Sequence, residues 1–363
     1  MDDRGTLARL LPAPRVVDWS LLAVALVALA TGVASLGVGA PDGAAVFLLH
    51  GATGAALAGL LAVKLRRVAG RLLHRRAWDR ATPLSVLTAA VAALAIATGI
   101  GWALGATVPL GFWTLLNVHV LFGLLVVPLV LVHLRARFRR PRRRDLDGRR
   151  DVLRYAGLAL AGAGAVRLAD ALARRFDTAA AAARFTGSRP LDDGDGAPAG
   201  RGNATFPVTS WVADDPDPIA VGDWRLRIGG LVETPLALAL DDLDPTATDR
   251  ALLDCTSGWY AVRDWEGVRL GDLLDGADVR EGARWVVVRS VTGYRWSFPL
   301  PEARDALLAT HVGGERLSHG HGFPLRLVVP GRRGFQWVKW VDRVEVRRRR
   351  DLGQYVSTLV SGL

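Results

Sequence analysis

The sequence predicts two fold classes in one chain: a membrane-embedded bundle of α-helices, then a mixed α+β, strand-rich domain. Long apolar runs occupy the first 135 residues, and short β-like runs alternate with turns after about residue 200. Charge divides in the same way. Residues 1–189 contain 25 Lys and Arg against 10 Asp and Glu, whereas residues 190–363 contain 21 against 25. A chain of 363 residues has room for both parts.

Four segments are long and apolar enough to cross a bilayer, which requires about 20 residues of helix. The two basic connectors, after the second and fourth segments, carry seven and nine Lys or Arg; residues 40–43 and 107–112 carry none. Because basic loops stay in the cytoplasm, we expect a multi-pass protein of the cytoplasmic membrane with its N-terminus inside. The predicted spans are Asp18–Gly39, Ala44–Val63, Leu84–Ala106 and Trp113–Leu134.

A short fifth apolar stretch, Tyr155–Val166, follows the sequence RRDVLR that begins at Arg149. This pattern resembles a twin-arginine export signal inside the chain. The alternative is a basic stop-transfer flank followed by an interfacial helix. A fifth crossing places the strand-rich domain on the extracytoplasmic side of the membrane.

The next segment is rich in Gly, Pro and Asp, which is typical of a flexible linker. It sets the boundary of the strand-rich domain. The predicted division is 1–145 for the four-helix module, 146–185 for the fifth segment, 186–202 for the linker, 203–350 for the strand-rich domain and 351–363 for a C-terminal tail.

Two histidines lie at matching depths in the predicted bundle. His50 and His119 each stand six residues into a span, and the two spans run in the same direction. Two imidazoles at one depth can supply both axial ligands of a b-type haem. The alternative is that each makes an interhelical hydrogen bond, but ionisable residues inside a bilayer are costly and usually functional. The pattern indicates a cytochrome-b-like module.

A second haem is left open. His133 follows His119 by fourteen residues, nearly four turns, so it projects from a similar face. The matching position on the second span is Lys64, whose ammonium form cannot be a ligand, and His74 lies further along. His133 is either a ligand of a second haem or an interfacial histidine.

Composition excludes several classes of protein. A sequence pI near 11 is compatible with nucleic-acid binding, but the excess of basic residues lies beside apolar helices and fits anionic membrane lipid instead. The single cysteine, Cys255, excludes an internal disulfide. No Gly-rich dinucleotide fingerprint opens a βαβ unit, so a Rossmann domain is not predicted.

Cys255 is the candidate metal ligand of the strand-rich domain. It follows an apolar run, in the sequence LDCTSGWY, where a loop can present a soft thiolate to a redox metal. For a cysteine taken alone, a buried structural side chain is the default interpretation. Its context carries the stronger argument.

Residues 203–347 resemble the sulfite oxidase superfamily, which includes the periplasmic methionine-sulfoxide reductase catalytic subunit. The resemblance rests on the cysteine segment together with four others: WRLRIGGL from Trp224, WEGVRLGDLL from Trp265, SVTGYRWS from Ser290 and HGFPLRLVVPGRRGFQWVKW from His321. It implies a molybdopterin-binding fold in which Cys255 ligates molybdenum through sulfur.

The resemblance also implies a set of cofactor contacts. The phosphate of molybdopterin needs cations and backbone donors, which the segment from His321 contains. Arg326 stands in an apolar run, where an unpaired charge is expensive, whereas Arg332 and Arg333 fit a solvated turn equally well. The implied cofactor-binding residues are Asn203, Phe206, Thr292, His321, Arg326, Arg332, Gly334, Val338 and Lys339.

The substrate pocket departs from the family pattern. Thr256-Ser257-Gly258-Trp259 replaces the arginine-containing stretch of sulfite oxidases, and Ser257 replaces a glutamate of the methionine-sulfoxide reductases. Sulfite is therefore not expected as substrate. Trp259 and Tyr294 are candidate catalytic residues lining the pocket, although aromatic residues after a turn are more often part of a core.

The resulting prediction is a membrane-bound molybdopterin-dependent oxidoreductase. It performs oxo-transfer or two-electron chemistry on a small extracytoplasmic substrate and exchanges electrons through haem b, and from there with quinone. The rival is a membrane cytochrome whose outer domain binds a ligand or partner without catalysis. A third possibility is cleavage after the Ala- and Gly-rich stretch, which leaves the helices as a separate product.

Overall fold

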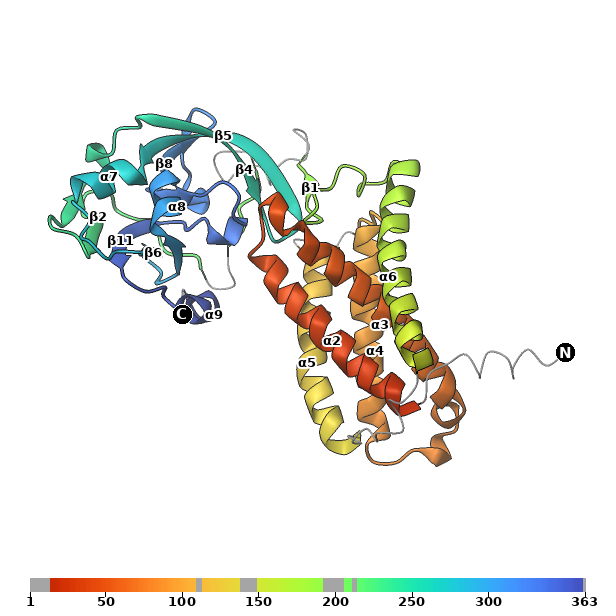
Figure 1. Ribbon diagram of the computed structural model, residues 1–363. Helices are drawn as coiled ribbons and strands as arrows, with labels where there is room; N and C mark the ends of the chain where they lie inside the picture. Colours follow the sequence, from red (N-terminus) through yellow and green to blue (C-terminus); the bar gives the residue numbers. More distant parts are fainter. Residues whose placement is uncertain (1–13, 109–112, 138–148, 192–205, 211–213, 362–363) are drawn as a thin grey trace. The chain divides into compact units, whose positions relative to one another are not determined.

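A computed structural model describes residues 14–108, 113–137, 149–191, 206–210 and 214–361. The chain forms two compact units, Met1–Arg189 and Pro190–Leu363. The first is helical and the second is built mainly of strands (Figure 1).

Four helices of the first unit have the length and apolar composition of membrane spans. Their outward side chains include Leu26, Leu94 and Leu131, between 46 and 60% exposed. Exposed leucines in such number are expected where lipid replaces water around a bundle. The helices are α2 (Pro14–Leu36), α3 (Ala44–Leu73), α4 (Thr82–Ala103) and α5 (Leu115–Arg137), with short 3-10 turns η1 (Pro41–Gly43) and η2 (Arg75–Ala77) in two connectors.

The bundle consists of two helix pairs, α2 with α3 and α4 with α5. At one end of the bundle, ion pairs join elements far apart in sequence: Lys64 with Asp18, and Arg137 with Asp79. The Lys64 ammonium is thus paired with a carboxylate. Lys64 stands at the position on the second span that matches His133, and in this form it cannot be a haem ligand.

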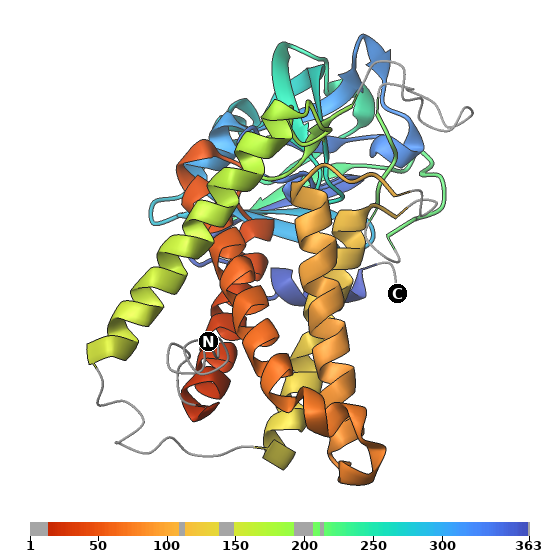
Figure 2. The same cartoon turned by 90° about the vertical axis from the view of Figure 1, so that its right-hand side faces the viewer.

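Helix α6 (Arg149–Arg175) packs along α3 (Figure 2). The contact is close, since a Cβ on Gly162 would lie 2.6 Å from the carbonyl oxygen of Ala52. Small residues allow helix backbones to approach in this way. Its 27 residues extend well beyond the short stretch expected from the sequence.

The segment after α6 folds onto the end of the bundle that carries the two connectors without Lys or Arg. Arg184 donates to the carbonyl of Gly39 at 3.2 Å, and Arg189 donates to the carbonyl of Trp102 at 2.9 Å. Arg189 also lies over the ring of Trp102 at 3.8 Å, and Ser188 is fully buried. The predicted linker begins at residue 186. Its first residues are instead held in place by these polar and cation–π contacts.

The second unit contains two sheets. One has the strand order β1-β5-β8-β10, with β4 on β5 and β9 on β8; the other has the order β3-β2-β11-β6-β7, in which only β2 and β11 pair in parallel. The first sheet comprises β1 (Arg189–Pro190), β4 (Ala247–Asp254), β5 (Trp259–Arg269), β8 (Leu307–Val312), β9 (Glu315–Arg316) and β10 (Arg326–Val328). The second comprises β2 (Leu226–Gly230), β3 (Leu236–Leu238), β6 (Trp285–Ser290), β7 (Arg295–Pro299) and β11 (Val341–Arg347).

One apolar core holds the second unit together. Large side chains such as Trp265, Trp337 and Phe298 are at most 1% exposed, and each contributes about 1.5–3 kcal/mol or more by leaving water. Short helices α7 (Leu270–Gly276) and α8 (Leu300–Asp305) cover strand ends. The expected mixed, strand-rich α+β fold is thus confirmed, as is the helical bundle before it.

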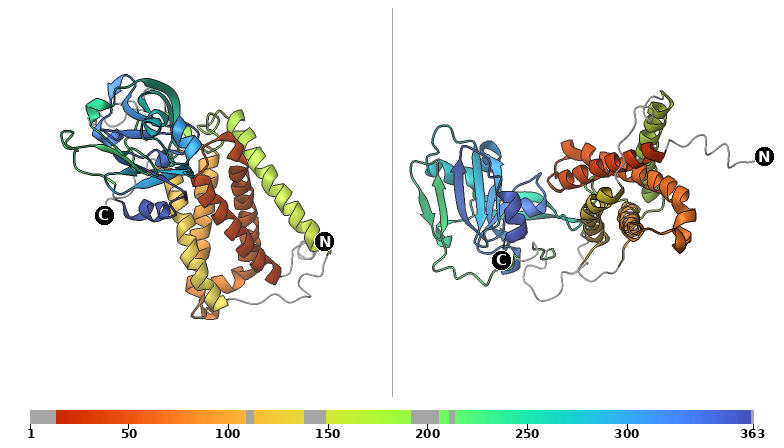
Figure 3. Two further views of the ribbon diagram at one scale, coloured as in Figure 1. Left: turned by 60° about the vertical axis from the view of Figure 1, so that its left-hand side comes forward. Right: turned by 90° about the horizontal axis from the view of Figure 1, so that it is seen from below.

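The expected C-terminal tail is instead a helix. α9 (Gln354–Val360) packs against β7 at the edge of the second unit (Figure 3). The sequence pattern missed it because the residues that it buries are polar: Gln354 is 0% and Ser357 2% exposed.

Candidate functional site

Cys255 lies directly after β4, in the tight turn that leads into β5. Its N–H donates to the carbonyl of Trp259 at 2.8 Å, and Gly258 takes a left-handed φ of 96° to close the turn. The thiol is 7% exposed. The N–H of Ser257 points at Sγ from 3.4 Å, and the Thr209 hydroxyl lies 3.6 Å from it.

The loop Arg333–Gln336 packs against the cysteine turn. Arg333 makes a buried ion pair with Asp254 at 3.2 Å and donates to the carbonyl of Cys255 at the same distance. Gly334 permits the close approach, because a Cβ there would lie 3.2 Å from the carbonyl oxygen of Asp254. Cys255 is therefore held by rigid structure on both sides.

Arg326 places a buried positive charge near the thiol. Its side chain is 4% exposed, and Nη1 donates to the carbonyl of His321 at 2.9 Å. Burial lowers the pKa of Arg326 to about 10. The charge of Cys255 has the opposite effect and raises this pKa. Within the described ranges no carboxylate lies within ion-pair distance of Arg326, and its Nε has no partner. Among the described groups, the charge that favours this guanidinium is that of Cys255.

Lys339 adds a second enclosed cation. Its ammonium donates to the carbonyls of Thr209 at 2.8 Å and Gly320 at 2.6 Å. Burial, together with the charge of Arg326, lowers the pKa of Lys339 to about 7. A cation whose charged form is this unfavourable gains stability when an anion binds next to it.

His321 is buried and fully hydrogen-bonded. Nε2 donates to the carbonyl of Phe206 at 2.9 Å, which leaves Nδ1 to accept from the Ser318 hydroxyl at 2.8 Å. Burial lowers the pKa of His321 to about 4, so the ring is neutral. The expected hydrogen bond to pterin or phosphate requires one of these two bonds to break, because both ring nitrogens are occupied.

The turn Ser290–Tyr294 faces the same region. Thr292 donates through its hydroxyl to Ser290 Oγ at 3.0 Å, and the Tyr294 hydroxyl donates to the carbonyl of Phe335 at 2.7 Å. Burial raises the pKa of Tyr294, so it stays a phenol. Asp214, a residue that the sequence did not single out, lies close enough to Thr292 for the threonine to favour its charged form.

Asp214 is a buried carboxyl close to Lys339. It is 7% exposed, burial raises its pKa, and its Oδ1 has no partner in the part of the chain described. Asp214 stands in the run ADDPDP, which the sequence analysis did not single out. An aspartate followed by a second acid and a proline gives no sign of burial, so tertiary contacts alone identify it.

Four other expected site residues belong to the core or to an ion pair. Trp259 and Phe206 are 9% and 3% exposed and pack together, with ring centroids 6.0 Å apart, and Val338 is 1% exposed. Arg332 forms a two-point pair with Glu302, and this pairing raises its pKa. Contact of these residues with a cofactor stays a prediction. Asn203 lies outside the described residues.

The fold of the bundle places the predicted histidine pair, His50 and His119, close together. The rings of His50 and His119 have centroids 5.9 Å apart at 77° to one another. Nδ1 of His50 donates to the carbonyl of Ala28 at 3.0 Å, and Nδ1 of His119 donates to that of Ala95 at 2.8 Å. Since a carbonyl only accepts, Nδ1 carries the proton in both rings, and Nε2 is the atom with a free lone pair.

A repeat in the sequence underlies this symmetry and could have predicted it. The acceptor segments are ALATGV from Ala28 and AIATGI from Ala95. Gly32 and Gly99, at the same place in each copy, make room for the imidazoles: a Cβ would lie 3.1 Å from Cε1 of His50 and 2.8 Å from Cε1 of His119. For His133, by contrast, Nδ1 has no partner among the described residues.

Comparison with known proteins identifies the second unit. Residues 213–355 match the family model of the oxidoreductase molybdopterin binding domain. An uncharacterized oxidoreductase of Bacillus subtilis, YuiH, is 31% identical over 154 residues, which cover 41% of this chain and 77% of that protein. The chain is a molybdopterin-binding oxidoreductase.

Other members of the family are longer than the matched region. The catalytic subunit MsrP of the protein-methionine-sulfoxide reductase of Gluconobacter oxydans is 32% identical, over 34% of this chain and 46% of that protein. The NADPH nitrate reductase of Mycosarcoma maydis is 31% identical, over 35% and 18%. The sulfane dehydrogenase SoxCD from Paracoccus pantotrophus is a structural match at 32% identity and a TM-score of 0.35, covering 37% and 40%. The chain thus spans less than half the length of these three.

Proposed function

We propose that this molybdopterin-binding oxidoreductase is a membrane-bound enzyme in which Cys255 ligates molybdenum and the His50–His119 pair ligates a b-type haem. The observation that carries the proposal is the electropositive, enclosed surrounding of one thiol. Arg326 and Lys339 lie near Cys255 without a carboxylate in ion-pair distance among the described residues. An unpaired buried charge is costly, so an anionic, sulfur-bound cofactor supplies what these residues lack.

Each residue of the site has a role that its contacts support. Cys255 binds the metal as thiolate, stabilised by the Ser257 N–H and the Thr209 hydroxyl. Arg326 and Lys339 hold the negative charge of the pterin and its phosphate. When bound, the molybdenum cofactor supplies two-electron redox capacity and oxygen-atom transfer. Asp214, a buried carboxyl near Lys339 whose pKa is raised by burial, lies beside the site.

The histidine pair supports the haem half of the proposal. The two rings, with centroids 5.9 Å apart, could both hold a haem iron, which would supply one-electron transfer. Hydrogen bonds from Nδ1 to Ala28 and Ala95 orient the rings and increase the basicity of Nε2, as outer partners of ligating histidines generally do. His133 remains the candidate ligand of a second haem.

The direction of the chain supports an extracytoplasmic site. The basic connectors follow the second and fourth spans in sequence, while residues after α6 contact Gly39 and Trp102, near the connectors that lack Lys and Arg. By the positive-inside rule, α6 then leads out of the cytoplasm, in agreement with the RRDVLR export signal. The haem exchanges electrons with quinone in the membrane.

The substrate that we propose is a small oxo compound, namely a sulfoxide, an N-oxide or an oxyanion. Its support is chemical: enclosed cations at Arg326 and Lys339 favour polar or anionic oxygen near the metal. The named relatives act on methionine sulfoxide in proteins and on nitrate, and both are oxo compounds.

Metal analysis of the purified full chain tests the proposal. We expect about one molybdenum and at least one haem per chain, with Cys255→Ser losing the molybdenum signal in EPR while haem absorbance is unchanged. Val221→Ser, an exposed position in the same unit, is the matched control. A Cys255→Ser protein with an unaltered molybdenum spectrum would overturn the ligand assignment.

A further inference from the structure

The C-terminal helix α9 has its polar side inward and its apolar side outward. Gln354 and Ser357 are buried at 0% and 2% exposure, whereas Leu352, Tyr355 and Val356 are 72%, 50% and 57% exposed. A helix of a water-soluble domain normally shows the opposite arrangement. The exposed residues form one patch at the end of the second sheet, next to the arginine run that precedes them in sequence.

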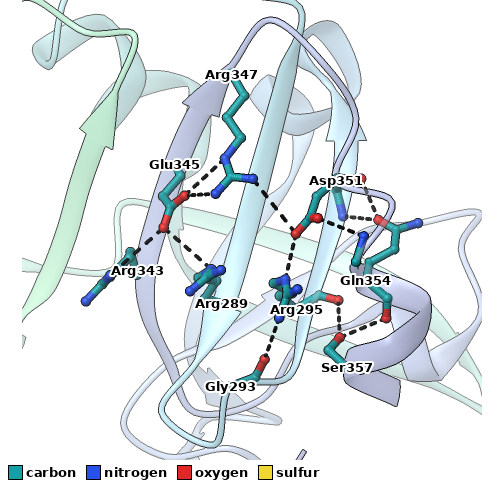
Figure 4. A network of polar contacts seen from close by, with 11 residues as sticks. Arg289, Gly293, Arg295, Arg343, Glu345, Arg347, Asp351, Gln354 and Ser357 are labelled. Carbon is teal, nitrogen blue, oxygen red and sulfur yellow. Dashed lines mark hydrogen bonds and ion pairs between the residues drawn. The ribbon is translucent and has the colours of Figure 1, made fainter. Parts of the chain in front are cut away.

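Buried polar contacts impose this orientation (Figure 4). The N–H and hydroxyl of Ser297 both donate to Oε1 of Gln354, at 2.9 and 2.5 Å, and Arg295 pairs with Asp351 at 2.6 Å just before the helix. The Ser357 hydroxyl donates to the carbonyl of Arg295, on β7, at 3.4 Å. Turning α9 to bury its apolar residues would break these bonds, so the exposure is built into the fold.

The patch is also strongly basic. Arg348, Arg349 and Arg350 are consecutive and exposed. The neighbouring carboxylates are already shared: Glu345 pairs with Arg289 at 3.5 Å, with Arg343 at 3.9 Å and with Arg347 (Figure 4). Asp351 is held by Arg295. The run therefore faces solvent with a net positive charge.

We propose that this C-terminal edge, composed of Arg348–Arg350, Leu352, Tyr355 and Val356, rests on the headgroup region of an anionic lipid bilayer. Arginines beside exposed aliphatic and aromatic side chains are the composition of an interfacial membrane contact. The inference rests on the insertion of α2–α5 in a membrane. It is independent of what the cofactor site does.

Lipid fits the edge better than a second copy of the chain. A two-fold contact sets the same patch against itself, which would oppose Arg348–Arg350 to their own counterparts. Three exposed apolar side chains also fall far short of the about 800 Å² per partner of a stable protein interface. They suffice for a domain tethered to the bilayer by its own chain, because tethering replaces most of the association cost.

Hydrogen exchange of the full chain in lipid nanodiscs tests the proposal. Amides of residues 352–358 should exchange more slowly in phosphatidylcholine mixed with phosphatidylglycerol than in phosphatidylcholine alone, by about fivefold for each arginine that reaches the surface. High salt should remove the difference. Replacing Arg348, Arg349 and Arg350 by glutamine should abolish it, and Val356→Ser should reduce it.

The controls separate this inference from the proposed function. Arg316→Gln and Val221→Ser, an exposed arginine and an exposed valine elsewhere in the unit, should leave the lipid effect intact. Cys255→Ser should dock like the unaltered chain, because the edge does not involve the thiol. Fast exchange in both lipids overturns the proposal; so does slow exchange that follows protein concentration instead of lipid charge, since a second copy then covers the edge.

Discussion

The two candidate redox sites of this chain differ in the charge of the groups that surround them. The site around Cys255 collects charges, with Arg326, Lys339 and Asp214 enclosed in the second unit. The site around His50 and His119 collects neutral groups, and its rings are oriented by backbone carbonyls. The difference follows from the surroundings: an aqueous domain tolerates buried charge that an anionic ligand will neutralise, whereas a bilayer core penalises any charge.

A variant that loses the cofactor of one site and keeps that of the other distinguishes the two sites most directly. His50→Leu should remove haem completely while molybdenum content stays unchanged, because an apolar side chain supplies no axial ligand. His74→Leu, an exposed histidine of the connector, is the matched control and should keep haem. Pyridine haemochrome absorbance and elemental analysis measure both quantities; haem retained in His50→Leu would remove the assignment of that ligand.

Arg326→Met should separate cofactor binding from stability. Removing a desolvated cation that meets an anion weakens cofactor retention by about 2–5 kcal/mol, or roughly 30- to 5,000-fold. The cofactor-free protein should nevertheless become no less stable, since an unpaired buried charge is replaced by an apolar side chain of similar length. Molybdopterin content and urea unfolding provide the two measurements. Equal losses in both would mean that Arg326 is structural.

The titration of Lys339 gives the charged site a pH dependence. Its pKa of about 7 in the folded protein lies below its ordinary value of 10.5. The unfolded chain therefore binds more protons between these values, and the cofactor-free protein should gain stability as pH rises from about 7 toward 10. Anion affinity should change in the opposite direction, being highest below pH 7. In Lys339→Met both trends should be weaker, as thermal unfolding against pH would show; an unchanged slope excludes Lys339 as the source.

The smallest effect concerns one hydroxyl in the neutral site. Thr31 Oγ1 lies 3.2 Å from Nδ1 of His50, whereas the equivalent Thr98 bonds only within its own helix, to Leu94 and Ala95. Thr31→Val should weaken haem binding by about 1 kcal/mol, close to fivefold, and Thr98→Val by less. Haem titration of the two variants checks the order. The reverse order would show that the two helix pairs are not distinguished by this hydrogen bond.

Some features followed from the sequence alone because they are local or periodic. Hydropathy located the four helices within a few residues at most ends, and the short β-like runs after about residue 200 indicated the strand-rich domain. The family motifs around Cys255 were sufficient to predict the molybdopterin-binding fold that the comparisons confirm. The equal depth of His50 and His119 was likewise readable from residue spacing.

Tertiary structure decided what depends on partners distant in the chain. Which cations lack a counter-charge could not be read locally: Arg332 and Arg333 are paired with Glu302 and Asp254, while Arg326 is not paired with any described carboxylate. Burial of Asp214 and the inverted face of α9 depend on the strands against which these residues pack. Local pattern determines helices, strands and motifs, because each is set by near neighbours. Burial and charge balance are set by contacts that form only when the chain has folded.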